Sequence, residues 1–195
     1  MSAMNRTIAT ALLALVVLPA SELLAEPIVR SFEVEPGSRI EAETDAGSID
    51  VSPTDGTTLT VEVDISGPGA ADFEVNFKER DGRIEGDGRA GGGIIGSRRS
   101  SVDVEYRIQV PHQFDIEVDT SGGSINVGDL DGSVRAETSG GSIEVGRISG
   151  PVWASTSGGG IHVEFSGGDV EADTSGGSIR IEEADGQVSA EQTVT

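Results

Sequence analysis

The chain has 195 residues, of which 34 are acidic and 13 basic, so its formal net charge is −21. This length suits one domain, or at most two small ones. The negative charge argues against nucleic acid and anionic lipid as partners, because both polyanions select surfaces rich in Lys and Arg. The sequence contains no cysteine, which excludes disulfides, thiolate nucleophiles, Cys-ligated zinc and iron–sulfur clusters.

The first 25 residues have the layout of a secretory signal peptide. Arg6 supplies a positive charge, and an apolar run follows from Ile8 to Leu18. A break at residues 19–21 then precedes the expected cleavage after Ala25, with Ala20 as the alternative. The apolar run is too short to cross a bilayer, which needs about 20 apolar residues. We therefore expect residues 1–25 to be removed. Residues 26–195 would then be exported to the periplasm or the cell surface without a transmembrane span.

Residues 28–110 contain several stretches in which apolar and polar residues alternate, as in β-strands. These stretches cover residues 28–34, 39–51, 58–66, 72–77 and 102–110, and residues 49 and 51 are the aliphatic Ile49 and Val51. The glycine-rich residues 84–101 are typical of a flexible loop. No linker separates these stretches from the rest of the chain, so we expect residues 26–195 to form one domain.

Residues 120–191 consist of four consecutive units of equal length, each beginning with Thr-Ser-Gly-Gly. Within each unit the sixth and eighth residues are aliphatic, the fifteenth is Val and the seventeenth is Ala. This alternation predicts two short strands per unit, since period two places those side chains on one face. Repetition at a fixed period is the signature of a stacked array of units. The units begin at Thr120, Thr138, Thr156 and Thr174.

The repeats predict an all-β, parallel β-solenoid in which each 18-residue unit is one coil and equivalent strands stack about 4.8 Å apart. A left-handed hexapeptide solenoid has coils of the same length, but it requires an aliphatic residue at every sixth position. Those positions are polar or Gly here, so we favour a right-handed coil. We expect the glycines of Ser-Gly-Gly, and the later Gly of each unit, to adopt positive φ at the corners.

Three features of the sequence resemble one bacterial family. They are ETDAGSIDV at residues 43–51, YRIQVPHQFDIEVDTSGGSINV at residues 106–127, and the repeated SGGSI-x-V phrase. The chain is similar here to the exported β-solenoids named "putative adhesins", domain of unknown function 4097 (DUF4097). The resemblance implies a β-helix-like fold at the cell envelope. It supplies no agreed catalytic residues, so it implies none in this chain.

The sequence gives little sign of catalysis. His112 and His162 stand 50 residues apart and do not have the spacing of a zinc site. A serine nucleophile requires one activated side chain with a base, whereas the repeats offer four interchangeable serines. We expect no catalytic residue and no cofactor. The alternative is a polysaccharide-acting β-helix enzyme that uses surface carboxylates, although repeats without insertions lack the long loops that wall a cleft.

The last residue of each coil is predicted to form one stacked column. Like charges at this spacing repel by about 0.2–1 kcal/mol per exposed pair. We hypothesise that divalent cations bind this column, so that millimolar calcium raises the melting temperature more than sodium chloride of equal ionic strength. The candidate ligands are Asp119, Glu137, Asp173 and Glu191, with Ser155 between them.

Three further features suggest contacts with partners. Trp153 occupies an outward position, where it could stack on a sugar or anchor an envelope protein, and we expect it to be largely exposed. Arg98 and Arg99 form a basic pair that could meet an anionic group. The last strand, residues 188–194, offers an unpaired edge for weak end-to-end self-association.

A rank of threonines at the start of each unit raises a further possibility, an ice- or mineral-facing surface. Ice-binding solenoids need a flat double rank of Thr, whereas Ser and Gly follow each of these threonines and make a bend. We therefore favour an exported, non-catalytic binding or scaffold module of the cell envelope.

Overall fold

The computed structural model describes residues 27–80, 83–90 and 102–193. The predicted signal peptide, the pair Arg98 and Arg99, and Val194 lie outside these residues, so they stay predictions. In the described part all regular structure is β-strand, apart from one short 3₁₀ turn at Ala70–Asp72. None of the described segments forms a helix with the length and apolar character that a membrane span requires.

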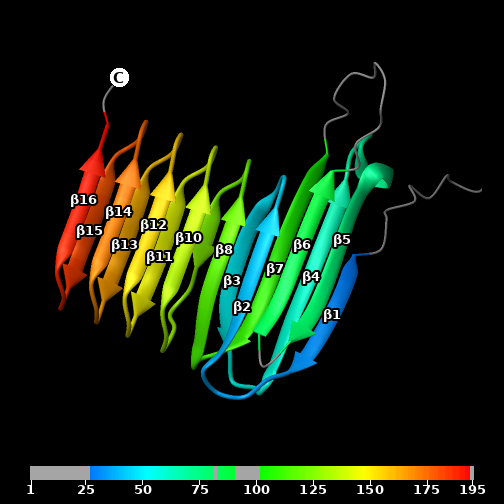
Figure 1. The fold of residues 1–195 in the computed structure, drawn as a ribbon, viewed down its shortest axis with the longest axis horizontal. Coiled ribbons are helices and arrows are strands. Elements are labelled where there is room, and N and C mark those ends of the chain that lie inside the picture. Colours follow the sequence, from blue (N-terminus) through cyan, green and yellow to red (C-terminus); the bar gives the residue numbers. More distant parts are fainter. Residues whose placement is uncertain (1–26, 81–82, 91–101, 194–195) are drawn as a thin grey trace, which may run out of the picture.

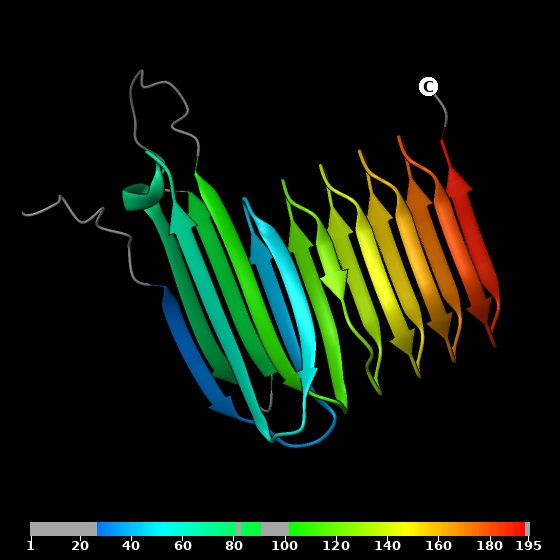
Figure 2. The ribbon, with the colours of Figure 1, turned by 180° about the vertical axis from the view of Figure 1, so that it is seen from behind.

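Sixteen strands form two eight-stranded sheets that lie one behind the other (Figures 1 and 2). The first sheet has the order β1-β4-β7-β3-β9-β11-β13-β15, and the second has the order β16-β14-β12-β10-β8-β2-β6-β5. The strands are β1 (Ile28–Glu33), β2 (Ser38–Thr44), β3 (Ser48–Thr54), β4 (Thr58–Ser66), β5 (Phe73–Arg80), β6 (Arg83–Ala90), β7 (Asp103–Pro111), β8 (Phe114–Thr120), β9 (Ile125–Val127), β10 (Val134–Thr138), β11 (Ile143–Ile148), β12 (Val152–Thr156), β13 (Ile161–Ser166), β14 (Val170–Thr174), β15 (Ile179–Ala184) and β16 (Val188–Gln192).

The repeats stack in parallel, and each residue pairs with its equivalent in the next unit. In the second sheet Val134 pairs with Val152, and in the first sheet Ile143 pairs with Ile161. Each unit thus gives one strand to each sheet, and equivalent residues form rows across the strands. This confirms the predicted pair of short strands per unit.

Residues 39–51 carry a partial copy of the repeat, with Ile49 and Val51 in its aliphatic positions, and they stack in the same register. Their place in the sheets differs from their place in the chain. Strand β3 pairs in parallel with β9 on one side and with β7 on the other. Strand β2 likewise lies between β8 and β6. The earliest of these units is therefore enclosed by two later parts of the chain. Strands β1, β4 and β5 extend the sheets beyond it through antiparallel pairs.

The core lies between the two sheets and consists of the aliphatic residues that alternate along the strands. Ile143 and Val145 are buried, with 0% and 2% of their surface exposed. The polar residue between them, Glu144, is exposed. The predicted strand phase is thus correct, and burial follows the repeat.

The prediction of a flexible loop over residues 84–101 is wrong for residues 84–90, which belong to β6. Gly86 and Gly88 occupy inward positions of that strand, where aromatic side chains fill the space. A Cβ at Gly86 would lie 3.0 Å from Phe77, and one at Gly88 would lie 2.0 Å from the Tyr106 hydroxyl. Glycine marks a close approach within a strand here, although glycine-rich sequence usually indicates a loop. Residues 91–101 lie outside the described residues.

The repeat glycines also have another role than expected. Among the described residues positive φ occurs at Gly37, Gly47 and Gly67, so the corners of the four units do not use it. The second Gly of Ser-Gly-Gly instead lies directly against the preceding coil. A Cβ at Gly141 would lie 2.2 Å from the carbonyl oxygen of Gly123. Only glycine allows the two turns to approach so closely.

The threonines at the start of the units point into the molecule, and they are buried. Each donates a hydrogen bond to a glycine carbonyl of the preceding turn at 2.7–2.8 Å. Each oxygen also accepts a backbone N–H of its own turn, as from Gly140 to Thr138 at 3.3 Å. This burial argues against an ice-facing role for the threonine rank, because no hydroxyl of the rank faces the solvent. The members are Thr120, Thr138, Thr156 and Thr174.

Candidate binding surface

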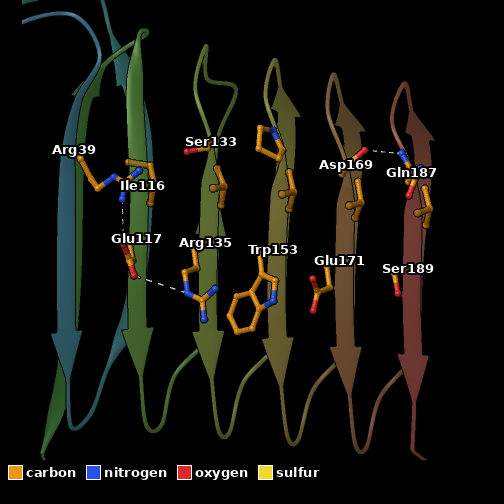
Figure 3. Close-up of a pocket in the computed structure, with 15 residues that line it drawn as sticks. Arg39, Ile116, Glu117, Ser133, Arg135, Trp153, Asp169, Glu171, Gln187 and Ser189 are labelled. Atoms are coloured by element: carbon orange, nitrogen blue, oxygen red, sulfur yellow. Dashed lines mark hydrogen bonds and ion pairs between the residues drawn. The ribbon is translucent and has the colours of Figure 1, made fainter.

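The outer face of the second sheet carries a row of side chains that includes the predicted contact residue Trp153. The register of the second sheet aligns one residue from each of the five neighbouring strands β8, β10, β12, β14 and β16. The row consists of Glu117, Arg135, Trp153, Glu171 and Ser189, and we call it the Trp153 row. Figure 3 shows these side chains pointing away from the core.

Trp153 and Arg135 stack on one another. The guanidinium carbon of Arg135 lies 3.5 Å from the centre of the Trp153 ring, which is a cation–π contact worth about 0.5–1 kcal/mol at an exposed site. Trp153 is consequently half-buried. The expectation that it is largely exposed is wrong in degree, because the neighbouring arginine covers one side of its ring. Its predicted outward direction is correct.

A surface hollow of about 460 Å³ contains the Trp153 row. Pro151, Asp169 and Gln187 also line it, from the residues just before β12, β14 and β16. The Gln187 backbone N–H donates a hydrogen bond to Asp169 Oδ1 at 2.8 Å, so the backbone holds this carboxylate in place. The hollow combines an aromatic ring with fixed polar groups, which is the composition of a small-ligand site.

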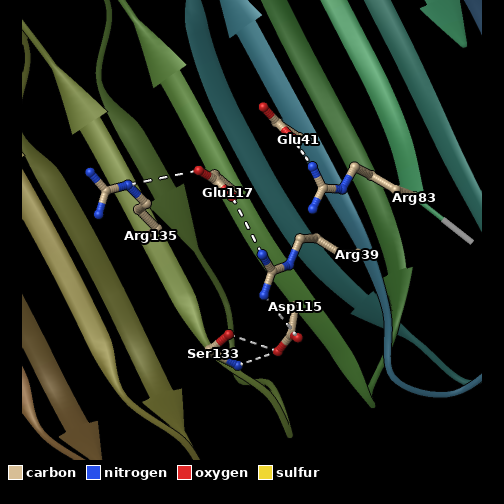
Figure 4. A network of polar contacts seen from close by, with 7 residues as sticks. All are labelled: Arg39, Glu41, Arg83, Asp115, Glu117, Ser133 and Arg135. Carbon is tan, nitrogen blue, oxygen red and sulfur yellow. Dashed lines mark hydrogen bonds and ion pairs between the residues drawn. The ribbon is translucent and has the colours of Figure 1, made fainter. Parts of the chain in front are cut away.

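Figure 4 shows the ion pairs of this face, and the strand register places them on the β10 and β8 side of Trp153. Glu117 lies between two arginines, with Arg39 at 3.6 Å and Arg135 at 3.8 Å. Arg39 also contacts Asp115 at 3.5 Å. Such exposed pairs add little stability, but they neutralise both arginines. On the other side of Trp153, Asp169 and Glu171 form no ion pair with any of the described residues.

Next to the Trp153 row lies the predicted acidic column. The register places Glu137 beside Asp119 and Ser155, and Asp173 beside Glu191, as expected. The column also extends to Glu43 and Asp87 on β2 and β6.

Within this column, partial burial and the neighbouring Glu137 raise the pKa of Asp119. Across the described chain, no group of three or more His, Asp or Glu side chains is arranged to hold a metal ion. The calcium hypothesis is therefore still a prediction.

Glu117 and Glu171, the two acidic residues of the Trp153 row, are not spaced as a glycosidase pair. Glu117 and Glu171 are separated by the strands of Arg135 and Trp153, which puts their backbones about 14 Å apart at ordinary strand spacing. Glycosidase pairs are about 5–9.5 Å apart.

Each histidine faces an acid outside the hollow, with Nε2 of His112 3.2 Å from Asp55 and Nε2 of His162 3.1 Å from Glu182.

The sequence singled out Trp153, but not the residues that surround it. Arg135 precedes Trp153 by one repeat and Glu171 follows it by one, so the repeat register already contained this adjacency. The pairing of Arg39 with Glu117 depends on where β2 is inserted, and no local pattern of the sequence indicates it.

Comparisons with solved structures find several proteins that are similar to this chain. No family model matches the chain, and no curated protein matches it either. A "putative cell adhesion protein" from Clostridium sporogenes is 12% identical, with 86% of this chain and 100% of that chain covered, at a TM-score of 0.47. A "putative adhesin" from Bacteroides fragilis is 15% identical, with 87% of this chain and 98% of that chain covered, at a TM-score of 0.26. A "putative adhesin" from Parabacteroides distasonis is 10% identical, with 86% of this chain and 94% of that chain covered, at a TM-score of 0.31.

Proposed function

We propose that this protein is an exported, non-catalytic β-solenoid of the cell envelope that serves as a binding or scaffold module. The observation that carries the proposal is the hollow around the stacked pair Trp153 and Arg135, on the outer face of the second sheet. An aromatic ring held in place at the surface supplies a large contact area at a low entropic cost.

The backbone beneath the hollow is built to be rigid. The strands that carry Arg135 and Trp153 pair in parallel over their whole length, and the buried Thr138 and Thr156 tie their corners to the preceding coils. Rigid sites lose little conformational entropy when a ligand binds. This supports a binding role for the face.

The other parts of the proposal rest on the sequence. The signal-like residues 1–25 support export, and the strong negative charge disfavours nucleic acid and anionic lipid as partners. The phrases at residues 43–51 and 106–127 support membership of the DUF4097 adhesin family. The general handedness of parallel connections supports a right-handed coil. The separation of Glu117 from Glu171 argues against a glycosidase that uses these two carboxylates as its pair.

A capture experiment tests this function. The protein, immobilised on beads, should retain material from a bacterial envelope extract, and Trp153→Ala should abolish the retention. Phe165→Ala is the matched control, since Phe165 stacks with Arg147 at 4.5 Å but lies in the first sheet. Equal retention by wild type and Trp153→Ala would contradict the proposed site. Release of reducing ends from a polysaccharide that depends on Glu117 or Glu171 would favour the enzyme.

A further inference from the structure

We infer that the hollow around Trp153 takes a neutral, hexose-based glycan. One sugar ring stacks on the face of Trp153 that is turned away from Arg135, and its hydroxyls donate hydrogen bonds to Glu171 and Asp169. This inference rests on the proposed binding function and specifies the chemical class of the ligand.

The cation–π contact between Arg135 and Trp153 defines the side from which the ligand approaches. Arg135 lies 3.5 Å from the ring centre, so that face of Trp153 is occupied. The register places Arg135 on β10 and Glu171 on β14, on opposite sides of Trp153 (Figure 3). We therefore place the ligand on the side of β14 and β16, where Asp169, Glu171 and Ser189 line the hollow.

The polar groups on that side accept hydrogen bonds. Glu171 is exposed, and Asp169 uses Oδ1 for the Gln187 backbone N–H, which leaves Oδ2 for a ligand. Ionised carboxylates only accept hydrogen bonds, and a charged acceptor makes a bond about twice as strong as a neutral one. Sugar hydroxyls are donors, so a ring with adjacent hydroxyls complements an aromatic face next to two carboxylates.

The charge of the surface selects against acidic glycans. Both arginines of the hollow are paired, Arg135 with Glu117 and Arg39 with Glu117 and Asp115. The acidic column adjoins the hollow through Asp173 and Glu191. A uronate or sialic acid carboxylate would meet uncompensated negative charge beside Glu171, and two like charges repel. A neutral sugar avoids this repulsion.

The test compares neutral with acidic polysaccharides. Soluble β-glucan, mannan and galactan are set against polygalacturonate and alginate, and binding is measured by affinity electrophoresis and calorimetry. We expect at least one neutral polysaccharide to bind and the acidic ones to fail. The affinity should fall about tenfold in Trp153→Ala, stay near wild type in Trp153→Phe, and fall in Glu171→Gln. Phe165→Ala should leave it unchanged.

Several outcomes would overturn the inference. Preferred binding of an acidic polysaccharide would do so, as would neutral binding that Trp153→Ala leaves intact. Envelope capture that depends on Trp153 but survives periodate oxidation of the extract, and is lost after protease treatment, would identify a protein partner. That result would overturn the glycan inference and leave the proposed binding function standing. The melting temperature of each variant shows whether a loss of binding reflects unfolding.

Discussion

Thr138 donates its hydroxyl proton to the carbonyl oxygen of Gly123, 15 residues earlier in the chain, at 2.7 Å. The same oxygen of Thr138 accepts the backbone N–H of Gly140 at 3.3 Å. One buried hydroxyl thus joins two successive coils at their corner. Gln192, which pairs with Thr174 in the row of threonines, makes the corresponding bond to Gly177 with its side-chain amide at 2.7 Å.

Replacement of Thr138 by Val should destabilise the protein. Val keeps the shape of Thr but leaves the partly buried Gly123 carbonyl and the Gly140 N–H without their partner, which costs about 1–3 kcal/mol. Urea unfolding measures the change. Thr138→Ser keeps the hydroxyl and should lose less stability than Thr138→Val. Equal losses in the two variants would show that the methyl group, and not the hydrogen bond, is responsible.

Gly141→Ala should cost about 3 kcal/mol, because its Cβ would lie 2.2 Å from the backbone oxygen of Gly123. Gly140→Ala in the same turn is the control. Its Cβ would meet Gly122 at an ordinary 3.5 Å, so it should change the stability by less than about 1 kcal/mol. Thermal melting of both variants tests this explanation. A larger loss in Gly141→Ala than in Gly140→Ala would show that close contact requires glycine at position 141, and equal losses would show that backbone flexibility does.

Ile143→Asp should destabilise by about 3 kcal/mol or more, because it places an unpaired carboxylate in the core. Glu144→Asp, one residue away on the exposed face, should change little. The free energy of unfolding in urea compares the two. Similar losses would contradict the strand phase, since a slip of one residue exchanges inside and outside.

The stability should fall as the pH rises above about 10. Burial raises the pKa of Tyr106 from its usual value of 10.0. At a pH between the Tyr106 pKa of the unfolded chain and the higher pKa of the folded protein, the folded protein binds more protons than the unfolded chain. The stability that Tyr106 contributes is therefore fully present below about pH 10 and is lost as the pH rises through the folded pKa.

Tyr106→Phe should remove this alkaline loss. Near pH 7 it should cost about 1 kcal/mol, because Tyr106 and Thr44 are hydrogen-bonded at 3.1 Å. Unfolding curves between pH 7 and 11 measure both effects. An unchanged alkaline slope in Tyr106→Phe would show that another group is responsible.

The outer edge of β16 should support weak end-to-end association between copies of the protein. Val188 is 52% exposed, and β16 pairs with β14 on one side while no described strand pairs with its other edge. The net charge of −21 repels copies, so the association should strengthen as salt screens the charge. Light scattering over a hundredfold range of protein concentration, at low and high salt, measures it.

A proline at Ala190 provides a specific test of this edge. Gln187 and Thr193 direct backbone groups toward β14. Alternation along a strand then turns the N–H of Ala190 outward. Ala190→Pro should abolish the association and leave the melting temperature nearly unchanged. A strict monomer in wild type under all conditions would contradict the prediction.

The sequence by itself determined the repeating half of this protein. A fixed repeat length, with aliphatic residues at alternate positions, requires equivalent strands to stack in parallel and places Ile143 inside and Glu144 outside. It also sets Arg135 beside Trp153, since one repeat separates them. These features depend on local alternation and on identical neighbours, so they can be derived without knowledge of the rest of the chain.

The tertiary structure alone decided the insertion of β2 and β3 between later strands, and with it the contact of Arg39 with Glu117. It also decided that residues 84–90 form a strand, because the rings of Phe77 and Tyr106 fill the space above Gly86 and Gly88. Such contacts join segments that share no repeat, and their geometry depends on which distant side chains occupy the same volume. The local alternation of apolar and polar residues therefore does not predict that packing.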